Sequence, residues 1–171
     1  DAFTKFQTAV SPVNGKVHFA MKANSALGIL ALISKLGGGM DIVSTGELAR
    51  ALAAGCKPND VVFSGVGKTA ADINEALTCG IGQINAESAA EVAAISAIAA
   101  SMGVMAPVAL RVNVDVDPGT HAKISTGQLD TKFGISTNQR EASDLYQKMA
   151  DDPHIIPTGL AGHIGSQICN L

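Results

Sequence analysis

Charged residues, aromatic residues and cysteines are all scarce in this sequence. Charged residues make up 16% of the 171 positions and aromatic residues 4%, whereas 47% of the residues are hydrophobic. The net charge is −3 and the lysines and arginines form no cluster, so the sequence lacks the basic patch that nucleic-acid binding needs. The composition argues against a disordered chain, and we expect one substantial core and no nucleic-acid partner.

The three cysteines, Cys56, Cys79 and Cys169, lie far apart and form no CxxC pair. Their number and spacing predict neither a zinc site nor a disulfide framework, so we expect no metal and a reducing compartment. No apolar run approaches the ~18 residues of a membrane span, and no basic and then apolar leader opens the chain. The sequence therefore predicts a cytoplasmic protein without a membrane partner.

Strand-like and helix-like hydrophobic patterns alternate along the chain. The hydrophobic residues are mostly Ala, Val, Ile and Leu, and 18 glycines accompany them, which suits packed helices and buried parallel strands. Ser44 with Glu47, and Ser88 with Glu91, have the spacing of capping boxes at helix starts. The expected strands cover residues 17–22, 40–43, 60–65, 81–86, 108–113 and 160–166, and the expected helices cover residues 25–36, 44–55, 69–79, 88–103 and 139–149.

The order of these segments predicts an α/β fold with an all-parallel sheet. A doubly wound sheet is the alternative, but Lys22-Ala23-Asn24 stands after the first strand, where a dinucleotide-binding sheet has its glycine-rich fingerprint. We therefore expect an incomplete (β/α)8 TIM-type barrel with about six of its eight strands. Residues 115–135 interrupt the rhythm, and we interpret them as a functional excursion.

Lys22 is the candidate reactive residue, because an apolar strand-like run carries it to a strand end beside Asn24. A partly desolvated lysine amine can form a Schiff base with a carbonyl, including that of pyridoxal phosphate. In a barrel the carboxyl ends of the strands converge, so polar residues at these ends belong to one rim. Besides Lys22, the rim residues are Asp41, Ser44, Ser64, Asn85, Glu87, Arg111, Asn113, His163 and Ser166.

Each rim residue also has a plainer interpretation. Lys22 can end a strand and lie in solvent, and Ser44 can serve only as a helix cap. His163 can be a satisfied core histidine, although Gly162 and Gly165 on either side would let a flat ring or a phosphate approach the backbone.

Four stretches carry a resemblance to a known family. They are residues 19–24 (FAMKAN), 41–48 (DIVSTGEL), 120–127 (THAKISTG) with 132–135 (KFGI), and 162–167 (GHIGSQ). Together they span nearly the whole chain and resemble diaminopimelate decarboxylases. The KAN and HIGSQ strings are shared with the wider group of alanine-racemase-like, fold-type III decarboxylases, including those for ornithine and arginine, whereas the 120–135 loop is more specific for the diaminopimelate branch.

The resemblance implies a pyridoxal 5′-phosphate enzyme that converts meso-2,6-diaminopimelate to L-lysine and CO2, the last step of lysine biosynthesis. It implies that Lys22 is the catalytic lysine that holds the cofactor covalently and that His163 stacks on the cofactor ring. Ser166 would bind the phosphate, while Asp41 and Arg111 would line the ring and its 3-hydroxyl side.

Several parts of the family have no counterpart in residues 1–171. These are the glycine-rich phosphate loop, the glutamate facing the pyridine nitrogen, the substrate arginine, and the Cys and Tyr that complete the site across a dimer. We therefore expect this chain to be part of the cofactor-binding barrel domain, with further strands and a C-terminal β-domain outside it. We also expect it to be inactive alone and to form a homodimer in the complete enzyme.

Three alternative functions share the lysine at the strand end. A related ornithine or arginine decarboxylase would use the same fold and cofactor. A non-catalytic protein that only carries pyridoxal phosphate would not need the excursion at residues 120–127. A cofactor-free Schiff-base aldolase would lack the visible absorbance of bound pyridoxal phosphate.

Overall fold

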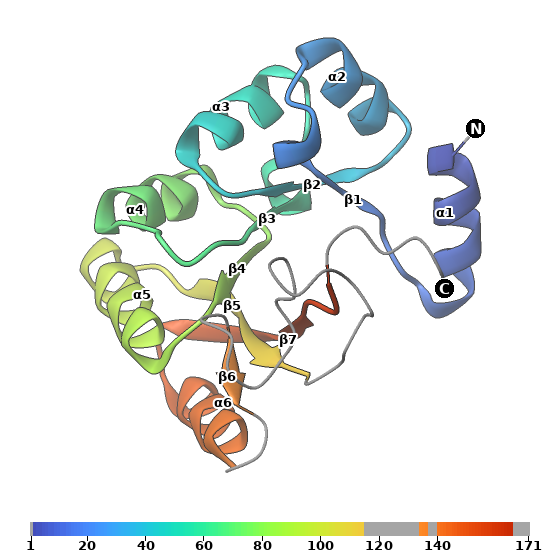
Figure 1. The fold of residues 1–171 in the computed structure, drawn as a ribbon. Helices are drawn as coiled ribbons and strands as arrows, with labels where there is room; N and C mark the ends of the chain where they lie inside the picture. Colours follow the sequence, from blue (N-terminus) through green and yellow to red (C-terminus); the bar gives the residue numbers. More distant parts are fainter. Residues whose placement is uncertain (1, 115–133, 137–139, 166–171) are drawn as a thin grey trace. The chain divides into compact units, whose positions relative to one another are not determined.

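The computed structural model of the chain describes residues 2–114, 134–136 and 140–165 (Figure 1). The chain forms two compact units, Asp1–Ile84 and Asn85–Leu171, which are called the first and the second unit below. Every strand pair described within a unit is parallel. This arrangement confirms the predicted α/β class and its parallel strands.

The first unit alternates strands with helices, and its strands pair in the order β1-β2-β3-β4. Three single turns of 3-10 helix, labelled η1 to η3, complete it. In chain order the elements are α1 (Ala2–Val10), η1 (Ser11–Val13), β1 (His18–Ala20), η2 (Met21–Ala23), α2 (Leu27–Lys35), β2 (Gly39–Ile42), α3 (Thr45–Ala53), η3 (Pro58–Asp60), β3 (Val61–Phe63), α4 (Ala70–Cys79) and β4 (Gln83–Ala86), whose second half belongs to the second unit.

Helices α2, α3 and α4 follow one another along the same side of β1, β2 and β3 (Figure 1). Contacts link α2 to α3 and α3 to α4, and α3 also packs on β2. A doubly wound sheet would carry helices on both faces, whereas a (β/α)8 barrel has them all outside. The packing of the first unit therefore supports the predicted barrel over the doubly wound alternative.

The core of the first unit is built from alternate residues of its strands. Met40 and Ile42 of β2, and Val61 and Phe63 of β3, are at most 1% exposed. Asp41 lies between two of these core residues and is only half buried. Successive side chains of a strand point to opposite faces, so Asp41 lies on the face of β2 opposite to Met40 and Ile42.

Polar side chains cap the N-termini of α3 and α4, and the cap of α3 differs in one bond from the predicted capping box. Ser44 Oγ accepts a hydrogen bond from the Glu47 N–H at 3.2 Å, as expected. The Glu47 carboxylate, however, accepts from the Val43 N–H at 2.7 Å, one residue before the position of a capping box. A complete capping box starts α4, where the bonds from Thr69 lower the pKa of Asp72.

The helix ends agree with the sequence. The α4 helix ends before Gly80 and α5 (Ala89–Met102) before Gly103, with φ angles of 71° and 66° at the two glycines. Glycine adopts this left-handed conformation without steric cost, so it ends helices efficiently. No helix within the described ranges is long and apolar enough to span a membrane.

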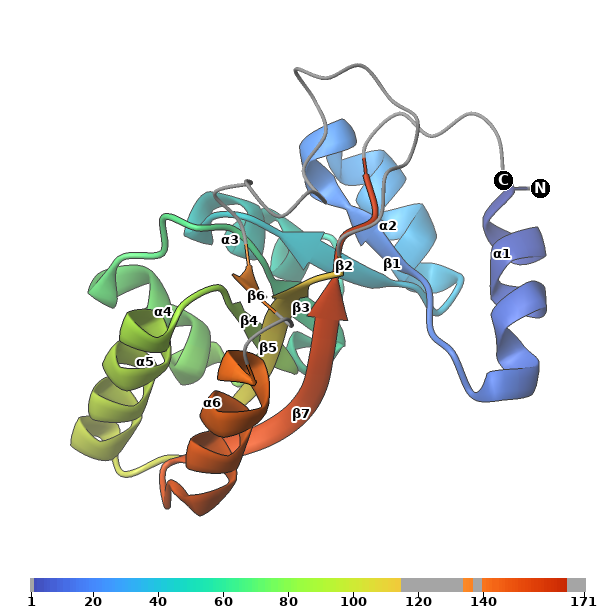
Figure 2. The same ribbon diagram turned by 60° about the horizontal axis from the view of Figure 1, so that its bottom comes forward.

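The second unit centres on β5 (Ala106–Asn113), most of whose residues are buried. β5 pairs along its length with β7 (Ile155–Gly162), and its last two residues pair with β6 (Ile135–Ser136). The helices of this unit are α5 and α6 (Glu141–Asp151). Figure 2 shows α6 lying along β7, in agreement with the contacts between them.

The last strand lies earlier in the chain than predicted. The sequence indicates a strand at residues 160–166, but β7 begins at Ile155 and ends at Gly162. The first half of β7 was not predicted as a strand, because it contains Pro157 and Gly159 and both residue types are unusual inside strands. The pairing of β5 with β7 also contains a register shift there. His163 therefore follows the strand instead of lying in it.

The excursion at residues 115–135 is described only at its end. Ile135, which was assigned to the irregular segment, begins the short strand β6 and is buried. Residues 115–133 lie outside the described residues, and so does the more specific part of the family resemblance at residues 120–127.

Candidate active site

Lys22 lies just beyond β1, in the turn η2, and its side chain is exposed. The sequence predicts that the strand reaches Lys22, but β1 ends at Ala20. Met21, 1% exposed, anchors the turn in the core, and its carbonyl accepts the Asn24 N–H at 3.1 Å. The Asn24 side chain then accepts the N–H of Ala26 at 2.9 Å, ahead of α2. Lys22 is therefore placed at the carboxyl end of β1 by a turn.

Asp41 is held by the neighbouring strand. The Ser64 hydroxyl donates to Asp41 Oδ1 at 2.6 Å, and the Ser64 N–H donates to the Ile42 carbonyl at 2.8 Å. Ser64 is the first residue after β3, so it reaches across to β2 from the strand end. In the register of the sheet, Asp41 is also aligned with Ala20 of β1. Lys22 follows that aligned residue by two positions, so both predicted residues occupy the same edge of the first unit.

A second cation, which the sequence does not single out, follows β3. Lys68 Nζ donates to the Gly65 carbonyl at 2.6 Å and lies 5.7 Å from the centroid of the Phe63 ring. A cation over an aromatic face is attracted by the ring quadrupole. The segment after β3 thus contributes both the Ser64 hydroxyl that donates to Asp41 and the anchored Lys68.

In the second unit, Arg111 is paired with Glu87. Arg111 Nη1 donates to Glu87 Oε1 at 2.9 Å, and the two side chains are 16% and 4% exposed. Arg111 lies near the end of β5, and Glu87 is the first residue after β4. The sequence places both residues on the rim, but it gives no sign that they touch, because 24 positions separate them.

The second carboxylate oxygen of Glu87 is unusual. Oε2 is buried, and none of the described residues donates a hydrogen bond to it. Leaving a buried acceptor unpaired costs about 1–3 kcal/mol, and more for a charged group. A bound water, an ion or a role in a binding site can each satisfy such an oxygen.

His163 is half buried and directly follows β7. The glycines on either side of it have structural reasons that the sequence does not show. Gly162 aligns with Val112 of β5, and a Cβ there would come within 3.3 Å of a methyl group of Val114. Gly165 has a φ angle of 147°, which favours glycine. Local packing and backbone conformation therefore give each glycine a reason of its own. Ser166 lies outside the described residues.

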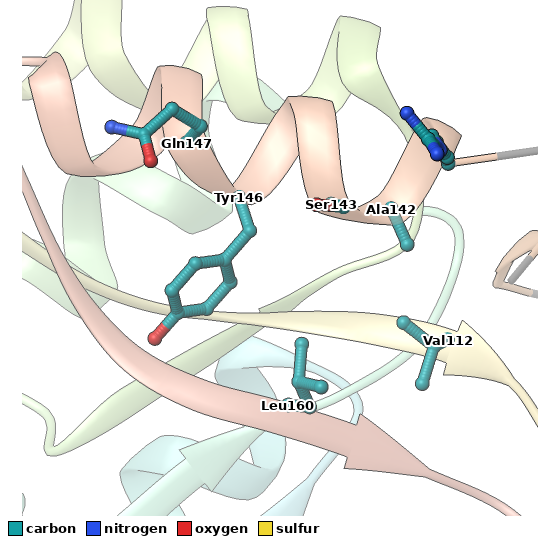
Figure 3. Close-up of a pocket in the computed structure, with 7 residues that line it drawn as sticks. Val112, Ala142, Ser143, Tyr146, Gln147 and Leu160 are labelled. Atoms are coloured by element: carbon teal, nitrogen blue, oxygen red, sulfur yellow. The ribbon is translucent and has the colours of Figure 1, made fainter.

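The second unit also contains a pocket, shown in Figure 3, between α6 and the strands β5 and β7. Tyr146 projects from the helix towards the strands, while Val112 and Leu160 point towards the helix (Figure 3). Val112 and Arg111 are adjacent in β5, so their side chains lie on opposite faces. The pocket is thus on the face covered by α6, whereas Arg111 belongs to the other face. It is lined by Val112, Arg140, Ala142, Ser143, Tyr146, Gln147 and Leu160.

Comparisons with known proteins identify the family of this chain. The model of the family "Pyridoxal-dependent decarboxylase, pyridoxal binding domain" matches residues 1–171. The chain belongs to this family. The resemblance read from the four sequence stretches is thereby confirmed.

Curated relatives narrow the comparison to one branch of the pyridoxal-dependent decarboxylases. The chain is 50% identical over 169 residues to diaminopimelate decarboxylase of Zymomonas mobilis, covering 99% of this chain and 40% of the relative. It is 47% identical over 169 residues to diaminopimelate decarboxylase of Pseudomonas aeruginosa, again covering 99% of this chain and 40% of the relative. The chain therefore spans about two fifths of the length of these relatives.

Solved structures of the family have the same fold. Diaminopimelate decarboxylase of Helicobacter pylori, complexed with L-lysine, matches with a TM-score of 0.87 and 42% identity, over 91% of this chain and 39% of that one. Its counterpart from M. jannaschii, in co-complex with L-lysine, matches with a TM-score of 0.81 and 37% identity, over 89% of this chain and 35% of that one. The predicted fold, part of a (β/α)8 barrel, is confirmed by these neighbours.

Proposed function

We propose that the complete protein containing this chain is a pyridoxal 5′-phosphate-dependent decarboxylase that converts meso-2,6-diaminopimelate to L-lysine and CO2. The observation that carries this proposal is the match of residues 1–171 to a pyridoxal-binding domain, together with diaminopimelate decarboxylases at 50% and 47% identity. The relatives are more than twice as long as this chain, so the activity is proposed for the complete protein.

The chemistry of the side chains fits the cofactor. Pyridoxal phosphate needs an amine to hold its carbonyl, and Lys22 offers an exposed amine at the carboxyl end of β1. The cofactor also carries anionic oxygens, and Arg111 is a cation whose direction is fixed by Glu87. Asp41, fixed by Ser64, supplies an ordered acceptor. These residues lie within the last residues of strands or directly after them, where barrel enzymes place their reactive groups.

In this proposal each residue has a defined task. Lys22 Nζ holds the cofactor covalently and, once released, can carry a proton at that nitrogen. His163 packs on the face of the ring, Ser166 binds the phosphate, and Asp41 and Arg111 line the ring. The bound cofactor supplies the electron sink for the electron pair that remains when the carboxylate leaves as CO2.

The substrate can be tested directly with the complete protein. We expect CO2 release from meso-diaminopimelate in the presence of pyridoxal phosphate, and little release from ornithine, arginine or lysine. A preference for ornithine or arginine would overturn the substrate assignment but keep the decarboxylase class. Bound cofactor absorbance without CO2 from any of these amino acids would instead favour a non-catalytic carrier of pyridoxal phosphate.

We also propose that the complete enzyme is a cytoplasmic homodimer. The support is the family resemblance, in which a second subunit contributes a Cys and a Tyr to each site. Sedimentation of the complete protein measures its mass in solution. A monomer with full activity would contradict this part of the proposal.

A further inference from the structure

The main chain of Glu87 is fixed by the first turn of α5. Glu87 stands between the end of β4 and Ser88, the N-cap of the helix. Its N–H donates to Glu91 Oε2 at 2.8 Å, while the Glu91 N–H donates to Ser88 Oγ at 3.1 Å. The cap therefore holds the backbone of Glu87 from the helix side. Its side chain points towards Arg111 of β5, which donates to it.

The side chain of Glu87 reaches Arg111 with only one of its two oxygens. Oε1 accepts from Arg111 Nη1 at 2.9 Å, whereas the buried Oε2 has no donor within the described part of the chain. A guanidinium carries several donors in a rigid planar fork, so a partner at Nη1 fixes the plane in which the other donors point. Glu87 thus restrains the orientation of Arg111.

Stability alone gives a poor account of this arrangement. A buried ion pair is often no more stabilising than a neutral pair of similar shape, because the charges lose their hydration. A glutamine at position 87 could still accept from Arg111 through its amide oxygen, but it would leave the largely buried guanidinium without a counter-charge. The glutamate adds an ionised acceptor to the ionised donor, which gives a stronger bond than a neutral amide oxygen gives. The charge of Glu87 therefore both compensates the guanidinium and holds Arg111 firmly.

We propose that Glu87 is a positioning residue, which orients Arg111 at the carboxyl end of β5 so that the guanidinium donates to an anionic oxygen of the bound cofactor. This inference rests on the proposed function. Glu87 acts through Arg111 and need not touch the cofactor itself. A group that acts only through another should have no effect once that other group is removed.

The test measures the dissociation constant of pyridoxal phosphate in the complete protein and the melting temperature without the cofactor. Glu87→Gln keeps the shape and one acceptor but removes the counter-charge of Arg111, so we expect the melting temperature to fall, and the dissociation constant is the deciding readout. The dissociation constant should rise by roughly fivefold to tenfold, because Arg111 exchanges an ionised acceptor for a neutral one and is held less firmly. In an Arg111→Met background, Glu87→Gln should change the constant no further.

A matched control removes a carboxylate at the other ends of the strands. Lys16 and Asp60 form an ion pair just before β1 and β3, in the first unit. Barrel residues at the amino ends of strands serve stability and not the chemistry. Asp60→Asn should therefore leave the dissociation constant of the cofactor at the wild-type value, even where it lowers the melting temperature.

The outcomes separate this inference from the proposed function. Wild-type protein that binds no pyridoxal phosphate overturns the proposed function. Wild-type binding with an unchanged constant in Glu87→Gln, or an equal loss in the Arg111→Met background, overturns the role of Glu87. A crystal structure of cofactor-free Glu87→Ala, or of Glu87→Gln where the alanine variant does not fold, gives a readout independent of the cofactor. We expect Arg111 to leave its position in the alanine variant or to show increased disorder in the glutamine variant, and an unchanged, equally ordered Arg111 overturns the inference.

Discussion

Ser64 donates its hydroxyl hydrogen to Oδ1 of Asp41 over 2.6 Å, which ties the end of β3 to β2. Glu87 and Arg111 repeat this relationship in the second unit, where the residue after β4 holds a residue of β5. In both cases a predicted site residue is oriented by the residue that follows a strand. The candidate site therefore depends on pairs of residues, and the first prediction tests one of them.

Replacing Ser64 with alanine should loosen Asp41 and weaken cofactor binding. The lost hydrogen bond to a carboxylate corresponds to about 1.5–3 kcal/mol, which should lower the melting temperature of the complete protein and raise the dissociation constant of pyridoxal phosphate. Ser64→Thr keeps the hydroxyl and is the matched control. An alanine variant with a lowered melting temperature but an unchanged constant would show that this bond serves the fold alone.

Replacing Lys22 with alanine should remove the covalent attachment of the cofactor. In the complete protein treated with pyridoxal phosphate and borohydride, we expect the label on the peptide that contains Lys22 and no label in Lys22→Ala. Turnover should fall by roughly a hundredfold or more, because a nucleophile and proton carrier is lost. Lys35, in the last turn of α2, offers a control, and Lys35→Ala should keep both label and activity. Label retained on another lysine in Lys22→Ala would refute the assignment.

The role of His163 can be separated from a core role by two substitutions. A flat ring packed on the cofactor contributes about 0.5–1.5 kcal/mol, so His163→Ala should raise the cofactor dissociation constant by roughly tenfold and His163→Phe by much less. Neither change should greatly lower the melting temperature, because His163 is only half buried after β7. A large drop in melting temperature with unchanged cofactor binding would instead identify a core histidine.

The rhythm of strands and helices could be predicted because it depends on local periodicity and helix caps. The helix ends at Gly80 and Gly103 are examples, since a left-handed glycine stops a helix whatever surrounds it. The end of β1 was not predicted, because the chain turns at Met21, whose side chain is buried in the core, before it reaches Lys22. Lys22 therefore lies beyond β1 but still at the carboxyl edge of the strands of the first unit.

The candidate site was predicted as a set of positions, but its contacts were not. A strand end is visible in the sequence, whereas the pairing of Glu87 with Arg111 depends on how two strands and a helix cap come together. The first half of β7 escaped prediction because Pro157 and Gly159 resemble loop residues. Side-chain partners between distant positions are a property of the fold and leave no local signal.

The stability of the protein should fall in mildly acidic solution because of His18. Burial in β1 lowers the pKa of His18; a hydrogen bond with the Lys16 backbone and the charges of Asp60 and Asp41 oppose this by raising it, whereas the charge of Lys16 lowers it. In the unfolded chain a histidine has a pKa of about 6.5. Between the lowered pKa and that value the unfolded state binds more protons, so stability rises with pH and is lost as the pH falls below about 6.5.

The measurement compares wild-type protein and His18→Gln, each melted at a series of pH values from about 5 to 7. Glutamine does not titrate, so the difference in melting temperature between the two proteins should change across this range. The melting temperature of wild type relative to that of His18→Gln should be higher at about pH 7 than at about pH 5, the two ends of the range. Asp72 and Asp152, whose pKa values are lowered, lose their contributions only in more acidic solution. A difference that stays constant with pH would contradict the burial effect.

Two glycines in the first unit should respond oppositely to a single added methyl group. Gly82 stands just before β4, and a Cβ there would lie 2.1 Å from the Asn59 carbonyl oxygen in η3. The Gly82 N–H also donates to the carbonyls of Pro58 and Val61, at 3.2 and 3.1 Å, so neither backbone segment can withdraw without losing bonds. Gly82→Ala should therefore destabilise the protein by about 1–3 kcal/mol.

Gly28, in the first turn of α2, is the matched control, because a Cβ there would meet nothing within 4 Å. Alanine favours the helix and restricts the unfolded chain, so Gly28→Ala should stabilise the protein by up to about 1 kcal/mol. Melting temperatures of the complete protein should then fall for Gly82→Ala and rise for Gly28→Ala. Since Gly82 lies at the amino end of β4, the dissociation constant of pyridoxal phosphate should be unchanged in Gly82→Ala. Equal melting temperatures for the two variants would mean that the turns before β3 and β4 are not pressed together as the structure has them.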